Sequence, residues 1–327
     1  MQTKARNLLV LVVLVAAITT IIFVSKSRTP QPAPQPPSAT PTPLTIGYTP
    51  VTGNLALFVA ENQGIFDRHG LDVTLQNFQN ATLHTQALLG GKLDGSATIP
   101  LPTALLLHLE QPGRFRLLVA NIYPREPGAD GILVATSSPA TSLADLRGKK
   151  IGVLPDASAI EFVKAMLEPS TGAGNFEIVQ IPVPNQVDAL AAGTVDAIWA
   201  LEPTLTVATQ KHVARILEEG SMSRHVAEPM VTAAFTLSSA FIAEHPRAAD
   251  EYKSALIEAA HWIEKEPEAA KRILPSYTNL PPELATHVRL VKYADIRDVE
   301  SALSSLSQWL RARNLLKADP PLQSLLY

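Results

Sequence analysis

Polar and aromatic side chains that could hold a small molecule follow several predicted strands at the point where each strand ends. Hydroxyl, amide and carboxylate groups of this kind donate or accept hydrogen bonds, and an aromatic ring can form a flat wall against a bound molecule. Several of these residues also lie beside a predicted helix start, where backbone N–H groups are free. The candidate ligand-binding residues are Thr49, Thr52, Asn54, Thr98, Ile99 through its backbone, Asn121, Asp156, Ser158, Trp199 and Glu202.

Several candidates also have a purely structural explanation, and the sequence leaves both explanations open. Ser158 and Glu161 fit the S-x-x-E capping box. Thr52 or Asn54 could cap the helix that follows them. Glu202 could simply favour the positive end of its helix dipole, and the tryptophan could pack in the core.

Signatures of common catalytic and cofactor sites are absent from the sequence. It has no G-x-S-x-G, H-E-x-x-H, P-loop or G-x-G-x-x-G motif. It has no cysteine, which excludes thiolate nucleophiles, thiolate metal sites and disulfides, and its 8 histidines are dispersed. The sequence therefore predicts a protein that is not an enzyme and that has no metal or cofactor. A net charge of −3 with scattered Lys and Arg argues against nucleic-acid binding.

A repeated segment indicates how the candidates are positioned. "ALLGGKLDGSA" begins at Ala87 and "ALAAGTVDAIW" begins at Ala189. In each copy a short helix is predicted to end at glycine, which favours the left-handed C-cap conformation, and the chain then turns through an aspartate into a buried strand. The residues concerned are Gly90, Gly91, Asp94, Gly193 and Asp196. We expect the two aspartates and the last glycine to be turn residues that contact no ligand.

The similarity between the two halves extends to whole units. "IGYTP" and "IGVLP" open them, and each continues as strand, helix, strand, helix, strand, helix. Parallel strands need such crossovers, so each half is predicted to be an α/β sandwich lobe with parallel strands. The 327 residues also exceed the roughly 250–300 that a single core supports. We expect the chain to cross between the lobes at residues 131–136 and 231–237, forming a hinge, and to end in a mainly helical remainder.

The N-terminal residues differ in composition from the rest. An uncharged apolar run at residues 8–24 is long enough to span a membrane, so residues 1–29 are predicted to be a signal sequence or, by preference, an uncleaved membrane anchor. Residues 30–43 are proline-rich and are predicted to form a stiff linker. The remainder would then be periplasmic or extracytoplasmic and held at the inner membrane. We expect lobe 1 to comprise residues 44–131 and 232–327, and lobe 2 residues 132–231.

An ordered set of motifs resembles the periplasmic solute-binding proteins of ABC importers. The motifs are "GIFDRHGLDV", "LADLRGKKIGV" and "VDAIWALEP". The similar subgroup is the nitrate, sulfonate, taurine and thiamine-pyrimidine-precursor family (SsuA/THI5-like, NMT1), and the resemblance covers about residues 44–320. It implies a bilobal type II periplasmic-binding-protein fold that closes on a ligand in its cleft. It also implies a monomer that captures a small polar nutrient and delivers it to a permease in the membrane.

Two alternative functions remain open at this point. A membrane-tethered ligand sensor would have the same cleft and differ only in its partner. Pyrimidine-synthesising enzymes share the resembled fold, but they carry a cysteine-rich motif that this chain lacks.

The acidic candidates bear on the class of ligand. Asp156 and Glu202 in one site would oppose a bare anion. The sequence therefore favours a ligand with an amine or several hydrogen-bond donors, such as an amino-sulfonate or an aminopyrimidine, over nitrate. Arg125 would reverse this expectation if its loop folded over the cleft.

Overall fold

The computed structural model describes residues 40–327. The predicted membrane segment at residues 1–29 and most of the predicted linker lie outside the described residues. Within residues 40–327, no helix is both long and apolar enough to cross a membrane.

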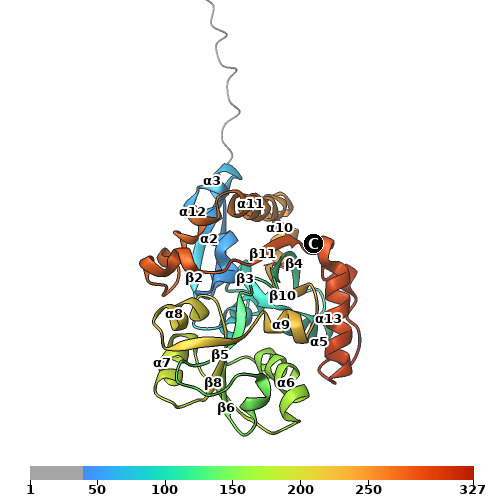
Figure 1. The fold of residues 1–327 in the computed structure, drawn as a ribbon. Coiled ribbons are helices and arrows are strands. Elements are labelled where there is room, and N and C mark those ends of the chain that lie inside the picture. The colour runs from blue at the N-terminus through green and yellow to red at the C-terminus, as the bar shows by residue number, and fades with distance from the viewer. Residues whose placement is uncertain (1–39) are drawn as a thin grey trace, which may run out of the picture. The chain divides into compact units, whose positions relative to one another are not determined.

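The first lobe is built on a 6-stranded sheet with the strand order β11-β4-β10-β3-β1-β2 (Figure 1). β1 pairs in parallel with β2 and β3, whereas β10 runs antiparallel to β3 and β4. Thr42 already pairs with Leu71, so this sheet begins inside the segment predicted to be linker. The strands are β1 (Thr42–Tyr48), β2 (Leu71–Asn77), β3 (Gly95–Pro100), β4 (Phe115–Tyr123), β10 (Met230–Ser238) and β11 (Lys292–Asp295).

Helices cover both faces of this sheet. Successive residues of a strand point to opposite faces, and two neighbours in β4 show this. Leu117 packs in the apolar cluster that contains residues of α5 and α13, and Leu118 packs in the cluster that contains α2 and α11. The helices of this lobe are α2 (Leu55–Asn62), α3 (Ile65–Arg68), α4 (Ala81–Leu89), α5 (Leu101–Glu110), α10 (Ser239–Glu244), α11 (Pro246–Lys265), α12 (Pro267–Lys271) and α13 (Glu300–Ala312).

The second lobe is built on a 5-stranded sheet with the order β7-β6-β8-β5-β9. β6 pairs in parallel with β7 and β8, and β5 runs antiparallel to β8 and β9. The elements are β5 (Asp130–Ala135), β6 (Lys150–Val153), α6 (Ala157–Thr171), β7 (Glu177–Gln180), α7 (Gln186–Ala191), β8 (Ala197–Leu201), α8 (Thr204–Gln210), β9 (Ala214–Glu219) and α9 (Ser221–His225). Figure 1 shows the lobe with α6 on one side of its strands and α7 and α8 on the other.

The chain passes from the first sheet to the second between β4 and β5 and returns between β9 and β10. The two-sheet α/β fold predicted from the sequence is confirmed, but the prediction of wholly parallel strands is wrong. β5 and β10 each begin where the chain has just arrived from the other sheet. They therefore run away from that shared edge, whereas the neighbouring strands run towards it.

The repeated aspartates make the same bond in both lobes. The Asp94 carboxylate accepts a hydrogen bond from the backbone N–H of Thr45 at 2.7 Å, and the Asp196 carboxylate accepts one from the N–H of Lys150 at 2.8 Å. Each thus ties the residue before one strand, β3 or β8, to the parallel neighbour of that strand, at the middle of β1 in the first lobe and at the start of β6 in the second. Gly91 and Gly193 have φ values of 68° and 70°, so the left-handed prediction is confirmed for these two. Gly90 has φ −78°, and for it the prediction is wrong.

Replacing Asp94 by alanine is expected to lower the free energy of unfolding by about 1–2 kcal/mol, because a partly buried backbone N–H would lose its acceptor. Asp196→Ala is the matched control in the second lobe. Its carboxylate is exposed, so water can replace the lost partner and the loss should be smaller. Urea denaturation measures both, and an equal loss in the two variants would show that burial does not govern this bond.

Candidate functional site

A cavity of about 730 Å³ lies where the strand ends of the two sheets meet. Its wall includes residues at or just after the ends of β1, β2, β3 and β4 of the first lobe and of β6, β7 and β8 of the second. Because side chains from both lobes contribute, a bound molecule would touch both. Of the candidates from the sequence, the wall contains Thr49, Thr98, Asn121, Asp156, Ser158 and Trp199.

The structure places the other four candidates behind the wall. Thr52 donates its hydroxyl hydrogen to the carbonyl oxygen of Glu202 at 2.9 Å. Asn54 donates to the carbonyl oxygen of Thr49 at 2.7 Å. Ile99 is fully buried in the core. The polar side-chain groups of Thr52 and Asn54 are therefore already hydrogen-bonded within the protein, and they support the wall from behind.

Glu202 is also fully buried, and its carboxylate serves the protein itself. It accepts hydrogen bonds from the backbone N–H of Thr206 at 3.1 Å and from the Thr206 hydroxyl at 2.9 Å. The backbone N–H of Arg289 donates to the same carboxylate at 3.2 Å. Burial raises the pKa of Glu202, and these hydrogen bonds oppose that shift. The helix-end role expected as the alternative is therefore the one that the geometry shows.

Thr98 occupies an unusual backbone position in the wall. Its φ is 58°, a left-handed value that is strained for a β-branched residue. Its hydroxyl donates to Oδ1 of Asn54 at 2.6 Å. Since the side-chain amide of Asn54 donates to Thr49 in turn, the three residues form one hydrogen-bonded chain along the first-lobe wall.

Asp156 caps α6 at the edge of the cavity. Its backbone is extended, with φ −142° and ψ 134°, and its Oδ1 accepts a hydrogen bond from the N–H of Ser158 at 2.7 Å. The predicted capping box of Ser158 and Glu161 is therefore replaced by an aspartate cap, and Glu161 pairs with Lys164 instead. Burial raises the pKa of the Asp156 carboxyl, against the effect of its hydrogen bonds. Arg125 is exposed and lies outside the cavity wall.

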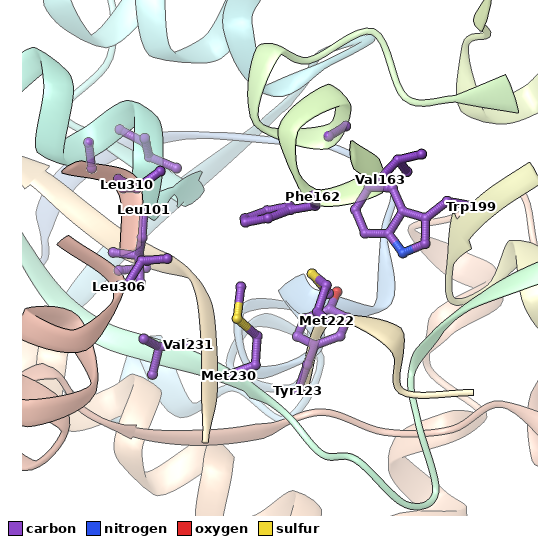
Figure 2. Packing of buried hydrophobic residues seen from close by; sticks show 14 of the residues in the cluster. Leu101, Tyr123, Phe162, Val163, Trp199, Met222, Met230, Val231, Leu306 and Leu310 are labelled. Carbon is purple, nitrogen blue, oxygen red and sulfur yellow. The ribbon is translucent and has the colours of Figure 1, made fainter. Parts of the chain in front are cut away.

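Aromatic side chains form much of the apolar wall. The rings of Phe162 and Trp199 meet edge to face with centroids 6.2 Å apart. Figure 2 shows these two rings beside each other, with Met222 and Tyr123 below them in the same cluster. Phe78, just after β2, contributes from the first lobe. Tyr123, Phe162 and Trp199 are at most 5% exposed, so only small parts of their rings reach the cavity, whereas Phe78 is half-buried and offers more of its surface.

Much of this apolar wall was missed by reasoning from the sequence. Phe78 follows a strand end, so the rule that selected Thr49 applied to it equally. Phe162 lies one helical turn after Ser158 and therefore on the same face of α6, a signal that was available. Met222 comes from the short helix α9, and no sequence pattern pointed to it.

Asp130, at the start of β5, lies directly behind the tryptophan and is fully buried. Its Oδ2 accepts hydrogen bonds from the Trp199 indole N–H at 3.1 Å and from the N–H of Met222 at 3.0 Å. Its Oδ1 is buried without a partner among residues 40–327. Burial raises the pKa of the Asp130 carboxyl to about 6, the two hydrogen bonds oppose this shift, and the nearby charge of Glu218 adds to it.

Asp130 is expected to make the protein less stable as the pH rises. Its folded pKa of about 6 lies above the ordinary value of 3.8, so the folded state binds the proton more tightly. This stabilisation is fully present below the ordinary value and is lost as the pH rises through the folded pKa, by about 3 kcal/mol. Asp130→Asn keeps an acceptor for both N–H groups but does not titrate.

Urea denaturation at a series of pH values would test this. The stability of the wild type minus that of Asp130→Asn should fall between roughly pH 4 and pH 7. Asp188→Asn, at an exposed position, controls for the change of net charge and should show no such trend. A difference between wild type and Asp130→Asn that stays constant with pH would contradict the prediction.

The fold and site define a class of two-lobed protein in which two α/β lobes, joined by two chain crossings, meet at a cavity of ligand size. The sequence profile of the NMT1/THI5 like family matches residues 52–270, which is more than half of the chain. The chain therefore belongs to this family, and the resemblance inferred from its motifs is confirmed.

Two solved structures illustrate the likeness. The ligand-binding component of an ABC-type import system from Staphylococcus aureus is 13% identical, with a TM-score of 0.73 over 88% of this chain and 96% of that one. The alkanesulfonate-binding protein SsuA from Xanthomonas axonopodis pv. citri, bound to MOPS, is 21% identical, with a TM-score of 0.71 over 88% and 99%. At these identities the comparison establishes the shared fold.

A further relative overturns the prediction that this chain is not an enzyme. The 2'-hydroxybiphenyl-2-sulfinate desulfinase of Rhodococcus erythropolis is 34% identical over 130 residues, which are 38% of this chain and 32% of the enzyme. The structure of the desulfurization enzyme DSZB matches with a TM-score of 0.65 and 22% identity over 87% of this chain and 96% of that one. Enzymes therefore occur on this fold, and the absence of common catalytic motifs does not exclude catalysis.

Proposed function

We propose that this chain is the extracytoplasmic solute-binding component of an ABC-type importer, a monomer that captures a small polar organic solute between its lobes and presents it to a membrane permease. The observation that carries the proposal is the position of the cavity, whose wall is shared by strand ends of both sheets. A solute held there contacts both lobes, so its binding free energy favours the arrangement in which the lobes are together.

The connections between the lobes support a hinge. Two segments of the chain, residues 124–129 and 220–229, join the sheets. Side-chain contacts add to them: the guanidinium of Arg289, which precedes β11, lies 3.4 Å from Glu202 and 3.0 Å from Glu219 of the second lobe. These contacts link the two lobes beside the second crossing, at residues 220–229.

The relatives support the class of function and leave the solute to be found. The matching structures include a ligand-binding component of an import system and an alkanesulfonate-binding protein. Both consist of lobes of the same fold, so capture in the cavity between the lobes is the simplest function that this geometry serves.

Solute capture would be tested with the full chain and a panel of sulfonates, amines, pyrimidines, amino acids and nitrate. A compound that binds the native state raises the melting temperature, and a concentration of 100 times its Kd stabilises by about 2.7 kcal/mol. Small-angle scattering of the same samples should show a smaller radius of gyration if the lobes close.

A pair of variants would place the binding event in the cavity. Leu154→Trp adds an indole at a half-buried position of the cavity wall and should reduce the thermal shift. Ile160→Trp is the matched control, half-buried on α6 but outside the wall, and should leave the shift unchanged. A shift that survives Leu154→Trp in full, or a panel in which no compound changes either measurement, would count against capture in this cavity.

A further inference from the structure

We propose that the solute of this cavity is an aromatic amine, meaning a flat ring that carries a protonated or N–H-donating nitrogen. The inference rests on the proposed capture of a solute between the lobes and narrows it to one chemical class. Three independent features of the wall lead to it: its aromatic surface, its charge and the direction of its hydrogen bonds.

The size and surface of the cavity match a ring. Cavities of roughly 300–1,000 Å³ enclose organic molecules of drug size, and this one has a volume of about 730 Å³. Its wall includes the rings of Phe78, Tyr123, Phe162 and Trp199. An inorganic anion would leave this apolar lining without a partner, whereas an aromatic ring can pack against it.

The charge of the wall opposes an anion. Among residues 40–327, no arginine lines the cavity, and the one lysine that does, Lys211, is exposed. Asp188 is exposed as well, so the half-buried carboxylate of Asp156 is the charge closest to the interior. This carboxylate caps the start of α6, the position at which backbone N–H groups would otherwise attract an anion. A cation near Asp156 would be attracted both by the carboxylate and by the aromatic faces.

Two neutral side chains of the wall, Asn121 and Thr98, have an oxygen that can only accept a hydrogen bond, but the oxygen of Asn121 is buried out of reach of the cavity. The side-chain amide of Asn121 donates to the carbonyl oxygen of Gly53 at 2.8 Å, which fixes its orientation, because a flipped amide would place two oxygens against each other. Its Oδ1 is then an acceptor, buried without a partner among the described residues. The hydroxyl hydrogen of Thr98 is already donated to Asn54, whose side-chain amide is fixed in orientation by its hydrogen bond to Thr49. The Thr98 oxygen can therefore only accept a further hydrogen bond.

The fixed polar groups of the wall include the acceptors of Thr98 and Asp156 and one donor, the side-chain amide of Asn80, whose Oδ1 accepts a hydrogen bond from a backbone N–H of α4. The hydroxyls of Thr49 and Ser158 can donate or accept and do not discriminate. Thr98 and Asp156 lack a free hydrogen to donate. A ligand that brings its own N–H donors can bind to both, whereas a ligand rich in acceptors would find no hydrogen to accept from them.

Matched probes separate these features on the full chain. Tryptamine carries an indole ring and a cation, indole-3-propionate carries the same ring and an anion, hexylamine carries a cation without a ring, and methanesulfonate is a small anion. Isothermal titration should find tryptamine to be the tightest of the four. Tighter binding of indole-3-propionate or methanesulfonate would overturn the inference while leaving solute capture standing, and binding of none of the four would overturn it as well.

Asp156→Asn tests the charge without removing the helix cap, because asparagine caps a helix as well as aspartate does. Tryptamine should bind this variant about tenfold to a hundredfold more weakly, and indole-3-propionate should bind no more weakly than before. Asp196→Asn is the matched control, since this aspartate also accepts one backbone N–H in the second lobe but lies outside the cavity wall. Unchanged tryptamine binding in Asp156→Asn would overturn the role of the carboxylate and with it the inference.

If no compound of the broader panel bound the chain or changed its scattering, solute capture itself would fail, and the choice of ligand class would fail with it. The two results are distinguishable, because an anion that binds in the cavity contradicts only the ligand class. Leu154→Trp reports the location in either case, since it obstructs the wall for ligands of any charge.

Discussion

Replacement of Trp199 by alanine is expected to lower the free energy of unfolding by about 3–5 kcal/mol, the usual range for a buried aromatic residue. The side chain is 3% exposed and packs against Phe162. Its indole N–H also donates to Asp130, so the alanine variant leaves both an empty space and a buried carboxylate with one donor fewer. Burial of this extent makes alanine unsuitable as a test of ligand contact alone.

Trp199→Phe separates the two causes, because it keeps a ring but removes the N–H. We expect this variant to lose about 1–3 kcal/mol, the penalty of an unsatisfied buried group. Urea denaturation monitored by circular dichroism measures both variants. A loss below about 1 kcal/mol for Trp199→Ala would show that the second lobe tolerates the space, and this prediction would then be wrong.

Replacement of Arg289 by methionine is expected to lower the free energy of unfolding by about 2–3 kcal/mol. Removing one partner of a fully buried ion pair costs about 3–5 kcal/mol, and the estimate is reduced because the Arg289 side chain is 26% exposed. Methionine keeps much of the apolar stem but leaves Glu202, whose side chain is fully buried, without its cation. The variant would also lose the contact of Arg289 with Glu219.

The pH dependence of this variant follows from the same pair. The charge of Arg289 lowers the pKa of Glu202, against the larger effect of burial, so the variant should hold a proton on Glu202 up to a higher pH. Its deficit in stability should therefore shrink as the pH falls. Arg311→Met is the control, because its ion pair with Asp319 is exposed, with side chains 47% and 52% accessible, and it should lose less than about 1 kcal/mol. Equal losses in the two variants would contradict the role given to the buried pair.

Several features of the fold were predictable because they depend on a few neighbouring residues. Gly193 has the left-handed backbone that its place after a short helix predicts. Asp94 and Asp196 sit in equivalent turns and make equivalent bonds. The alternation of strands and helices likewise indicated two α/β lobes, because a parallel strand needs a crossover.

Other features depend on where the chain crosses between lobes. β5 and β10 pair in the antiparallel sense, although their residues resemble those of the parallel strands. Residue type reports that a strand is buried, but its direction follows from the side on which the chain enters the sheet. Residues 124–129 and 220–229, which connect the two sheets, contain no sequence pattern that indicates the direction of the next strand.

The sequence by itself determined the two-lobed plan, the turns and the edge of each sheet at which a cavity could form, since periodicity and turn chemistry are local properties. Only the tertiary structure decided which strand-end residues line the cavity. The Glu202 carboxylate is buried and accepts a hydrogen bond from Arg289, 87 positions away, whereas the Trp199 indole donates to Asp130, 69 positions away. Such pairings depend on how the sheets and helices pack against one another. Residues this far apart in the sequence form no local pattern from which the contact could be predicted.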